Sequence, residues 1–125
     1  MQRGYRGVAG APVRPYAQFV VNAGNACWLD LVFLDRFNNL ATPTTVSYRI
    51  DNLTTDDVVL QDTTASSPAS SMTLTIPASL NTINSDIGQT SQINQVLVTA
   101  TFADGSQSKE VFIYELIALQ TVGGA

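Results

Sequence analysis

Apolar and polar residues alternate with a period of two along much of this chain, and this alternation limits its fold more than any other feature. The clearest examples are residues 46–51, Val-Ser-Tyr-Arg-Ile-Asp, and residues 72–76, Met-Thr-Leu-Thr-Ile. Successive side chains of a β-strand point to opposite faces of its sheet, so the pattern predicts strands with one buried face. We therefore expect an all-β protein.

Further segments with strand character are separated by turn residues. The predicted strands are 16–23, 27–35, 46–51, 58–62, 72–76, 93–103 and 109–119. Several short strands with frequent turns are typical of an immunoglobulin-like sandwich of two sheets. Pro77 precedes Leu80, Ile83 and Ile87, a spacing that predicts one helix of one or two turns between the sheets.

The chain divides into three parts, although its 125 residues suffice for only one domain. Residues 1–15 contain three glycines and two prolines without apolar periodicity, so they predict an extended N-terminal arm. Residues 16–119 form the predicted sandwich, and residues 120–125 form a flexible C-terminal tail.

Charge is distributed unevenly. Arg3, Arg6 and Arg14 make the arm basic, whereas the rest of the chain has three basic against ten acidic residues. The net charge of −4 disfavours nucleic-acid binding through phosphate neutralisation. We expect no membrane span, because no apolar run approaches about 20 residues. We also expect no signal peptide and hence synthesis in the cytoplasm, because no apolar segment follows Met1.

The residue types needed for most enzyme sites are missing or scattered. The chain has no histidine, and Cys27 is its only cysteine, so histidine-based catalysis, disulfides and cysteine-based metal sites are excluded. Asp56, Asp57 and Asp62 could bind a hard cation, but their spacing is not that of a calcium loop and a solvated turn is favoured. We expect no catalytic residue, cofactor or metal.

The Asp104-Gly105 dipeptide predicts a tight hairpin between the last two strands. A two-residue loop would pair residue 98 with 111 and residue 96 with 113. The side chains then facing the core are Val96, Val98, Val111 and Ile113. Those left on the outer face are Leu97, Phe112, Tyr114 and Leu116. An apolar outer stripe predicts a partner surface, unless a β-bulge or the N-terminal arm covers it.

In the other predicted strands, the alternate side chains that face inward make up the rest of the predicted core. Its members are Leu29, Leu31, Phe33, Val46, Tyr48, Ile50, Leu74 and Ile76. The opposite face of the segment 27–35 carries Trp28, Val32 and Leu34 around Asp30, so we expect this strand to be covered on both sides. Few aromatic residues then remain for an exposed sugar-binding platform.

Three segments together carry a resemblance to a known group. They are residues 45–54, which contain Val-Ser-Tyr-Arg-Ile-Asp-Asn-Leu-Thr, residues 72–78, which contain Thr-Ile-Pro-Ala, and the closing strand pair 95–119. With these segments, residues 16–119 resemble the small immunoglobulin-like structural proteins of tailed bacteriophages and prophages. The resemblance implies a non-enzymatic virion protein, made in the host cytoplasm, and carries over no catalytic residue.

Within that group the expected role is a capsid decoration, or cement, protein that stabilises the head. Its partners would be the major capsid protein or other virion proteins, in a homo-oligomer or multi-copy assembly, with no nucleic acid and no membrane. The basic arm and the outer stripe would contact the neighbouring subunits. A neck or tail component is an alternative, and an immunoglobulin-like carbohydrate- or receptor-binding module is another of a different class.

Overall fold

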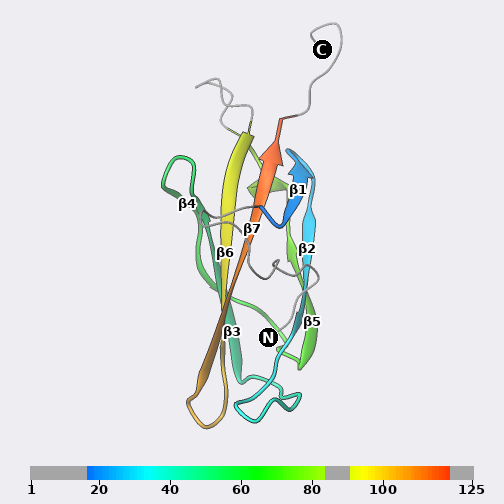
Figure 1. The fold of residues 1–125 in the computed structure, drawn as a ribbon, viewed down its shortest axis with the longest axis vertical. Coiled ribbons are helices and arrows are strands. Elements are labelled where there is room, and N and C mark those ends of the chain that lie inside the picture. Colours follow the sequence, from blue (N-terminus) through cyan, green and yellow to red (C-terminus); the bar gives the residue numbers. More distant parts are fainter. Residues whose placement is uncertain (1–16, 84–90, 119–125) are drawn as a thin grey trace, which may run out of the picture.

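The computed structural model describes residues 17–83 and 91–118, which form two facing β-sheets (Figure 1). The strands are β1 (Phe19–Asn22), β2 (Cys27–Val32), β3 (Thr45–Asn52), β4 (Asp57–Thr64), β5 (Ser71–Ile76), β6 (Ser91–Thr101) and β7 (Gln107–Ile117). One sheet has the order β1-β7-β6-β3-β4, and β2 and β5 form the other. The expected all-β sandwich is therefore confirmed.

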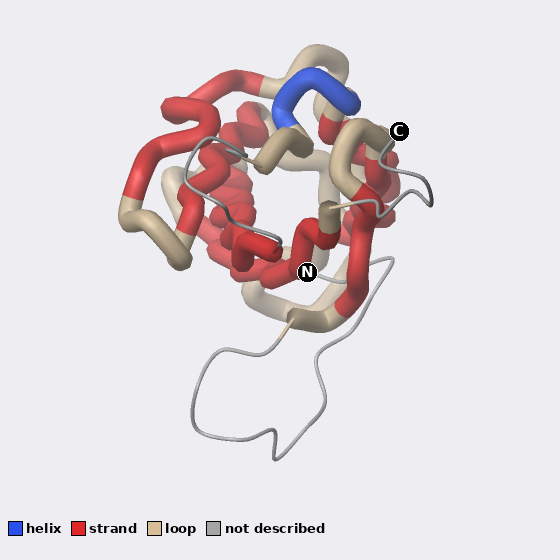
Figure 2. The backbone as a smooth tube through the Cα atoms, turned by 90° about the horizontal axis from the view of Figure 1, so that it is seen from above, coloured by secondary structure: helices blue, strands red, loops and turns tan. Residues whose placement is uncertain are grey.

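The chain crosses between the sheets directly after β1. This strand pairs in parallel with β7 at the edge of the five-stranded sheet, whereas β2 pairs antiparallel with β5 in the other sheet. Seen along the long axis, the strands surround a central core, and the short helix lies at the rim (Figure 2). A helix follows Pro77 as predicted, but η1 (Ala78–Leu80) is a single 3₁₀ turn that ends before Ile83, and Ile87 lies outside the described residues.

Side chains from both sheets fill the core in the alternation expected of half-buried strands. Leu29, Leu31, Ile50 and Ile76 are fully buried, as the sequence predicts. The remaining predicted core residues that are buried are Phe33, Val46, Leu74, Val96 and Val98. Tyr48 is half-buried and packs against this cluster.

The closing hairpin differs from the predicted one by a single residue. The loop has three residues rather than two, since the amide of Phe102 donates to the carbonyl of Ser106 at 2.9 Å. Within it, the amide of Gly105 donates to the carbonyl of Phe102 at 2.9 Å, and Gly105 has a φ of 86° that favours glycine. Consequently Val96 lies opposite Phe112, and Val98 lies opposite Glu110.

This shift turns every side chain of β7 to the other face of the sheet, because side chains alternate with a period of two. Phe112, Tyr114 and Leu116 are buried in the core, so their predicted place on an exposed outer face is wrong. Val111 is 43% exposed, and Ile113 is half-buried. Their predicted place in the core is wrong for the same reason.

Buried polar side chains connect the two sheets near η1. The hydroxyl of Tyr114 donates to the side-chain oxygen of Asn81 at 2.7 Å and accepts from the amide of Asn94 at 3.3 Å. The amide of Gln92 donates to the side-chain oxygen of Asn94 at 2.9 Å. Asn81 in turn donates to the carbonyl of Asn25 at 2.8 Å, which fixes the turn between β1 and β2. Buried polar groups need such partners, so this network fixes one arrangement of the core.

Candidate functional site

The residues predicted to bind a partner do not form one surface. Arg3, Arg6 and Arg14 lie outside the described residues. Of the four predicted residues of the hairpin, only Leu97 stays on the outer face, where it is half-buried. Phe112, Tyr114 and Leu116 cannot contact a partner from within the core.

An apolar stripe nevertheless lies on the outer face of the five-stranded sheet. Leu97 lies opposite Val111, and Ile113 follows on the same face of β7. We call Leu97, Val111 and Ile113 the outer stripe. An apolar stripe results from both the predicted and the observed pairing, because β7 has apolar residues at successive positions. The predicted pairing turns Phe112 and Tyr114 outward, and the observed pairing turns Val111 and Ile113 outward instead.

A second apolar surface lies on the connection between β2 and β3. Phe37 is 68% exposed and Leu40 is 65% exposed, and we call residues 35–40 the Phe37–Leu40 loop. The carboxylate of Asp35 accepts hydrogen bonds from the amides of Phe37 at 2.8 Å and Asn39 at 3.0 Å. The backbones of Asp35 and Asn39 are also bonded, at 2.9 Å, and Leu34 forms a β-bridge with Leu40. The loop is thus held in one conformation.

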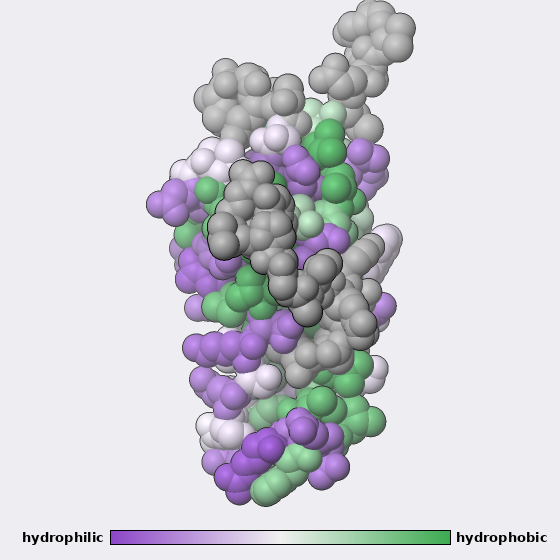
Figure 3. All heavy atoms as spheres, viewed as in Figure 1, coloured by the Kyte–Doolittle hydropathy of each residue, from purple (hydrophilic) through white to green (hydrophobic). Residues whose placement is uncertain are grey.

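This loop shares one end of the sandwich with the tip of the closing hairpin (Figure 1). The guanidinium of Arg36 lies 4.9 Å from the centre of the Phe37 ring, a cation–π geometry. Hydrogen bonds from Ser106 lower the pKa of Asp104, and the charge of Arg36 lowers it further. In the space-filling view, this lower end shows apolar surface on its right side next to hydrophilic surface (Figure 3). The sequence predicts a loop here but does not predict that it is an exposed contact surface. The one signal for such a surface is the presence of two apolar residues, Phe37 and Leu40, among turn-forming residues.

The outer face of β2 is open, which corrects the expectation that this strand is covered on both sides. Trp28 is 57% exposed, and Asp30 on the same face is exposed too. Beside them a groove of about 460 Å³ runs between β1 and β2. We call it the β1–β2 groove; its polar lining includes Asn22, Asn25 and Asp30.

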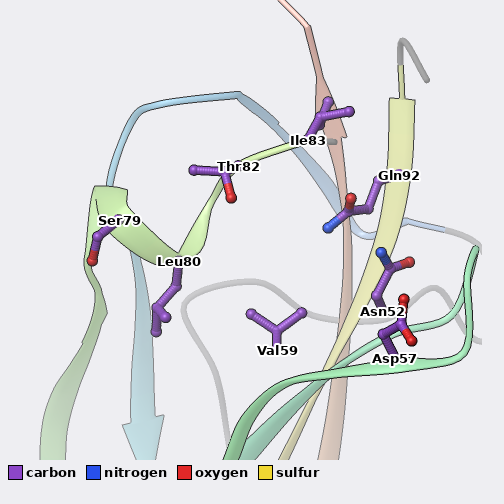
Figure 4. A pocket seen from close by; sticks show the side chains of 8 residues that line it. All are labelled: Asn52, Asp57, Val59, Ser79, Leu80, Thr82, Ile83 and Gln92. Carbon is purple, nitrogen blue, oxygen red and sulfur yellow. The ribbon is translucent and has the colours of Figure 1, made fainter. Parts of the chain in front are cut away.

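A smaller pocket of about 330 Å³ lies between β4 and η1 (Figure 4). Asn52, Asp57 and Gln92 lie on one side of it, and Leu80 lies on the other. The side-chain oxygen of Asn52 accepts from the amides of the following turn, and Gln92 bonds to Asn94. Asp57 is the only acid among the described residues of its lining, whereas general acid–base chemistry on a glycoside needs two.

A metal site requires a cluster of ligand side chains, and a membrane-spanning helix requires a long apolar sequence. Within 17–83 and 91–118, no three acidic or cysteine side chains lie close enough together to hold a metal. Across the same residues, no helix has the length and apolarity needed to cross a membrane. Neither the known protein-family models nor the curated proteins contain a match to this chain.

Proposed function

We propose that this chain is a non-enzymatic structural protein of a bacteriophage virion, most specifically a capsid decoration protein that contacts neighbouring subunits. The observation that carries the proposal is the Phe37–Leu40 loop. It presents two large apolar side chains, each more than three-fifths exposed, on a backbone fixed by hydrogen bonds. A surface of this kind fits a pocket on another protein.

The fixed conformation of the Phe37–Leu40 loop favours binding to a partner. Association costs the conformational entropy of every group that becomes fixed at the interface, and a loop that is already ordered avoids much of this cost. The two hydrogen bonds to the carboxylate of Asp35 and the bridge between Leu34 and Leu40 provide that order before any partner binds. Phe37 and Leu40 would then gain burial at little entropic cost.

Separate surfaces suit a subunit that has several neighbours. The Phe37–Leu40 loop lies at one end of the sandwich, and the outer stripe lies on the face of the five-stranded sheet. Arg3, Arg6 and Arg14 would add an electrostatic contact to an acidic neighbour. Weak contacts made at several places at once give strong overall attachment, because each later contact forms within the same complex.

The two hollows support a non-enzymatic role. Among the described residues, each has a single acid in its lining, Asp30 in the β1–β2 groove and Asp57 in the pocket beside η1. An enzyme that forms an acyl intermediate needs a nucleophile, its activating base and oxyanion donors around one reacting atom, and one that forms a glycosyl intermediate needs two carboxyl groups facing the same bond. The described residues of neither lining supply such a set.

The test is quantitative mass spectrometry of purified particles from a host that carries the gene. A copy number comparable to that of the major capsid protein is the expected result for a decoration protein. A copy number that corresponds to a single ring would place the chain in the neck or tail instead. Absence from intact particles would contradict the proposal.

A further inference from the structure

Trp28 is the most unusual exposed side chain of the sandwich, because a tryptophan normally contributes its large apolar surface to a core. It lies on β2 between the buried residues Cys27 and Leu29, so the alternation of the strand turns its indole outward. Across the two-stranded sheet it lies opposite Thr75. The indole is therefore presented on a surface of small hydroxyl side chains, which leave its ring accessible.

The polar groups beside this indole have hydrogen-bonding capacity to spare. In the β1–β2 groove, the hydrogen bonds of Asn22 and Asn25 with other described residues involve their backbones, which leaves both side-chain amides available. Asp30 accepts one bond at Oδ1, from the hydroxyl of Thr73 at 3.0 Å. That bond orients the carboxylate while its second oxygen remains open to a ligand.

The exposed indole and the amide and carboxylate groups beside it determine which class of ligand fits the groove. None of the described residues lining the groove is Lys or Arg, and Asp30 would repel an anion. A purely apolar ligand would bury the amides of Asn22 and Asn25 without partners, which costs free energy. A pyranose ring offers an apolar C–H face to an indole and hydroxyl groups to amides and carboxylates at its edge.

We propose that the β1–β2 groove binds a neutral oligosaccharide, with one sugar ring stacked on Trp28 and its hydroxyl groups bonded to Asp30, Asn22 and Asn25. This site is distinct from the Phe37–Leu40 loop and the outer stripe. It gives the chain a glycan-binding activity that does not depend on attachment to neighbouring subunits.

Trp28 is the only tryptophan of the chain, so its fluorescence reports directly on the proposed site. The experiment titrates the full-length protein with cellohexaose, maltohexaose and N-acetylchitohexaose in turn. At least one of them should produce a saturable change in emission. Calorimetry with the same sugar should show that Asp30→Asn weakens binding by about tenfold, because a bond to a charged acceptor is lost.

Variants separate this site from the rest of the surface. Trp28→Ala should abolish binding, Trp28→Phe should retain part of it, and Phe37→Ala, which removes another exposed aromatic side chain, should bind as the wild type does. Each variant should unfold with the wild-type midpoint, because Trp28, Asp30 and Phe37 are exposed. Failure of all three sugars to bind, or unchanged binding by Trp28→Ala, would overturn the proposal.

Incorporation into particles distinguishes this inference from the proposed function. Trp28→Ala should be incorporated at the wild-type level even though it no longer binds the sugar. If incorporation falls instead and no sugar binds the wild type, the groove is a protein contact, and the glycan proposal is wrong while the structural role stands.

Discussion

The hydroxyl of Tyr114 on β7 donates a 2.7 Å hydrogen bond to the side-chain oxygen of Asn81, and both residues are fully buried. Asn81 directly follows η1, so the bond joins the five-stranded sheet to the connection between β5 and β6. The Tyr114 ring also stacks on Phe19 of β1, with ring centres 5.2 Å apart. One side chain therefore connects three parts of the sandwich.

Removal of that hydroxyl should destabilise the protein without changing its fold. In Tyr114→Phe, the side-chain oxygen of Asn81 and the amide of Asn94 each lose a buried partner. We expect a loss of about 1–3 kcal/mol in the free energy of unfolding, measured by urea denaturation. Tyr48→Phe is the control, since Tyr48 is half-buried and its hydroxyl has no partner among the described residues. Equal stability of the two variants would contradict the role of the network.

The same tyrosine should make stability depend on alkaline pH. Burial raises the pKa of Tyr114, so its hydroxyl stays protonated in the folded state after tyrosine in the unfolded chain begins to ionise near pH 10. The stabilisation is complete below about pH 10 and is lost as the pH rises above it, by up to roughly 1.4 kcal/mol per pH unit. Denaturation at successive pH values should show a steeper loss for the wild type than for Tyr114→Phe. Parallel curves would show that Tyr114 does not contribute.

The register of the closing hairpin can be tested by two neighbouring substitutions. Phe112 is buried and Val111 is 43% exposed, so Phe112→Ala should cost about 3–5 kcal/mol and Val111→Ala less than about 1 kcal/mol. Chemical denaturation of both variants measures the difference. The reverse order of the two losses would indicate the two-residue loop.

The sequence defines strands best where apolar and polar residues alternate. In β5 and in residues 45–51 of β3, polar residues lie on one face only, so the side chains that face inward follow directly from the pattern. Asn52, the last residue of β3, is a buried polar side chain on the inward face. β7 contains Val111, Phe112, Ile113 and Tyr114 in succession, and both phases of such a run are apolar. Its register depends on whether the Asp104-Gly105 loop has two or three residues, and this dipeptide fits either loop.

The exposed surfaces depend on tertiary structure that a one-dimensional pattern does not contain. Trp28 is open because the second sheet consists of β2 and β5 with nothing packed on its outer face among the described residues. Phe37 and Leu40 point outward because Asp35 closes the loop beneath them. A prediction from hydrophobicity alone would place Trp28, Phe37 and Leu40 in the core.

The arm should be tested by deletion of residues 1–14, of which the described structure contains none. If the arm contacts an acidic neighbour, deletion should reduce incorporation into particles, and replacing Arg3, Arg6 and Arg14 by Glu should do the same. The fold should keep nearly its full stability, because the described core consists of residues 19–116. The truncated protein at full copy number would show that the arm makes no required contact.

The most direct test of the structural role is the amount of a loop variant incorporated into particles. The variant is Phe37→Ser with Leu40→Ser, and the control is Val58→Ser, which changes an exposed valine on β4. The ratio of each protein to the major capsid protein is measured by mass spectrometry, after denaturation confirms wild-type stability. We expect a loss of at least about tenfold for the loop variant, equivalent to about 1.4 kcal/mol, and no change for the control. Wild-type incorporation of the loop variant would contradict the structural role.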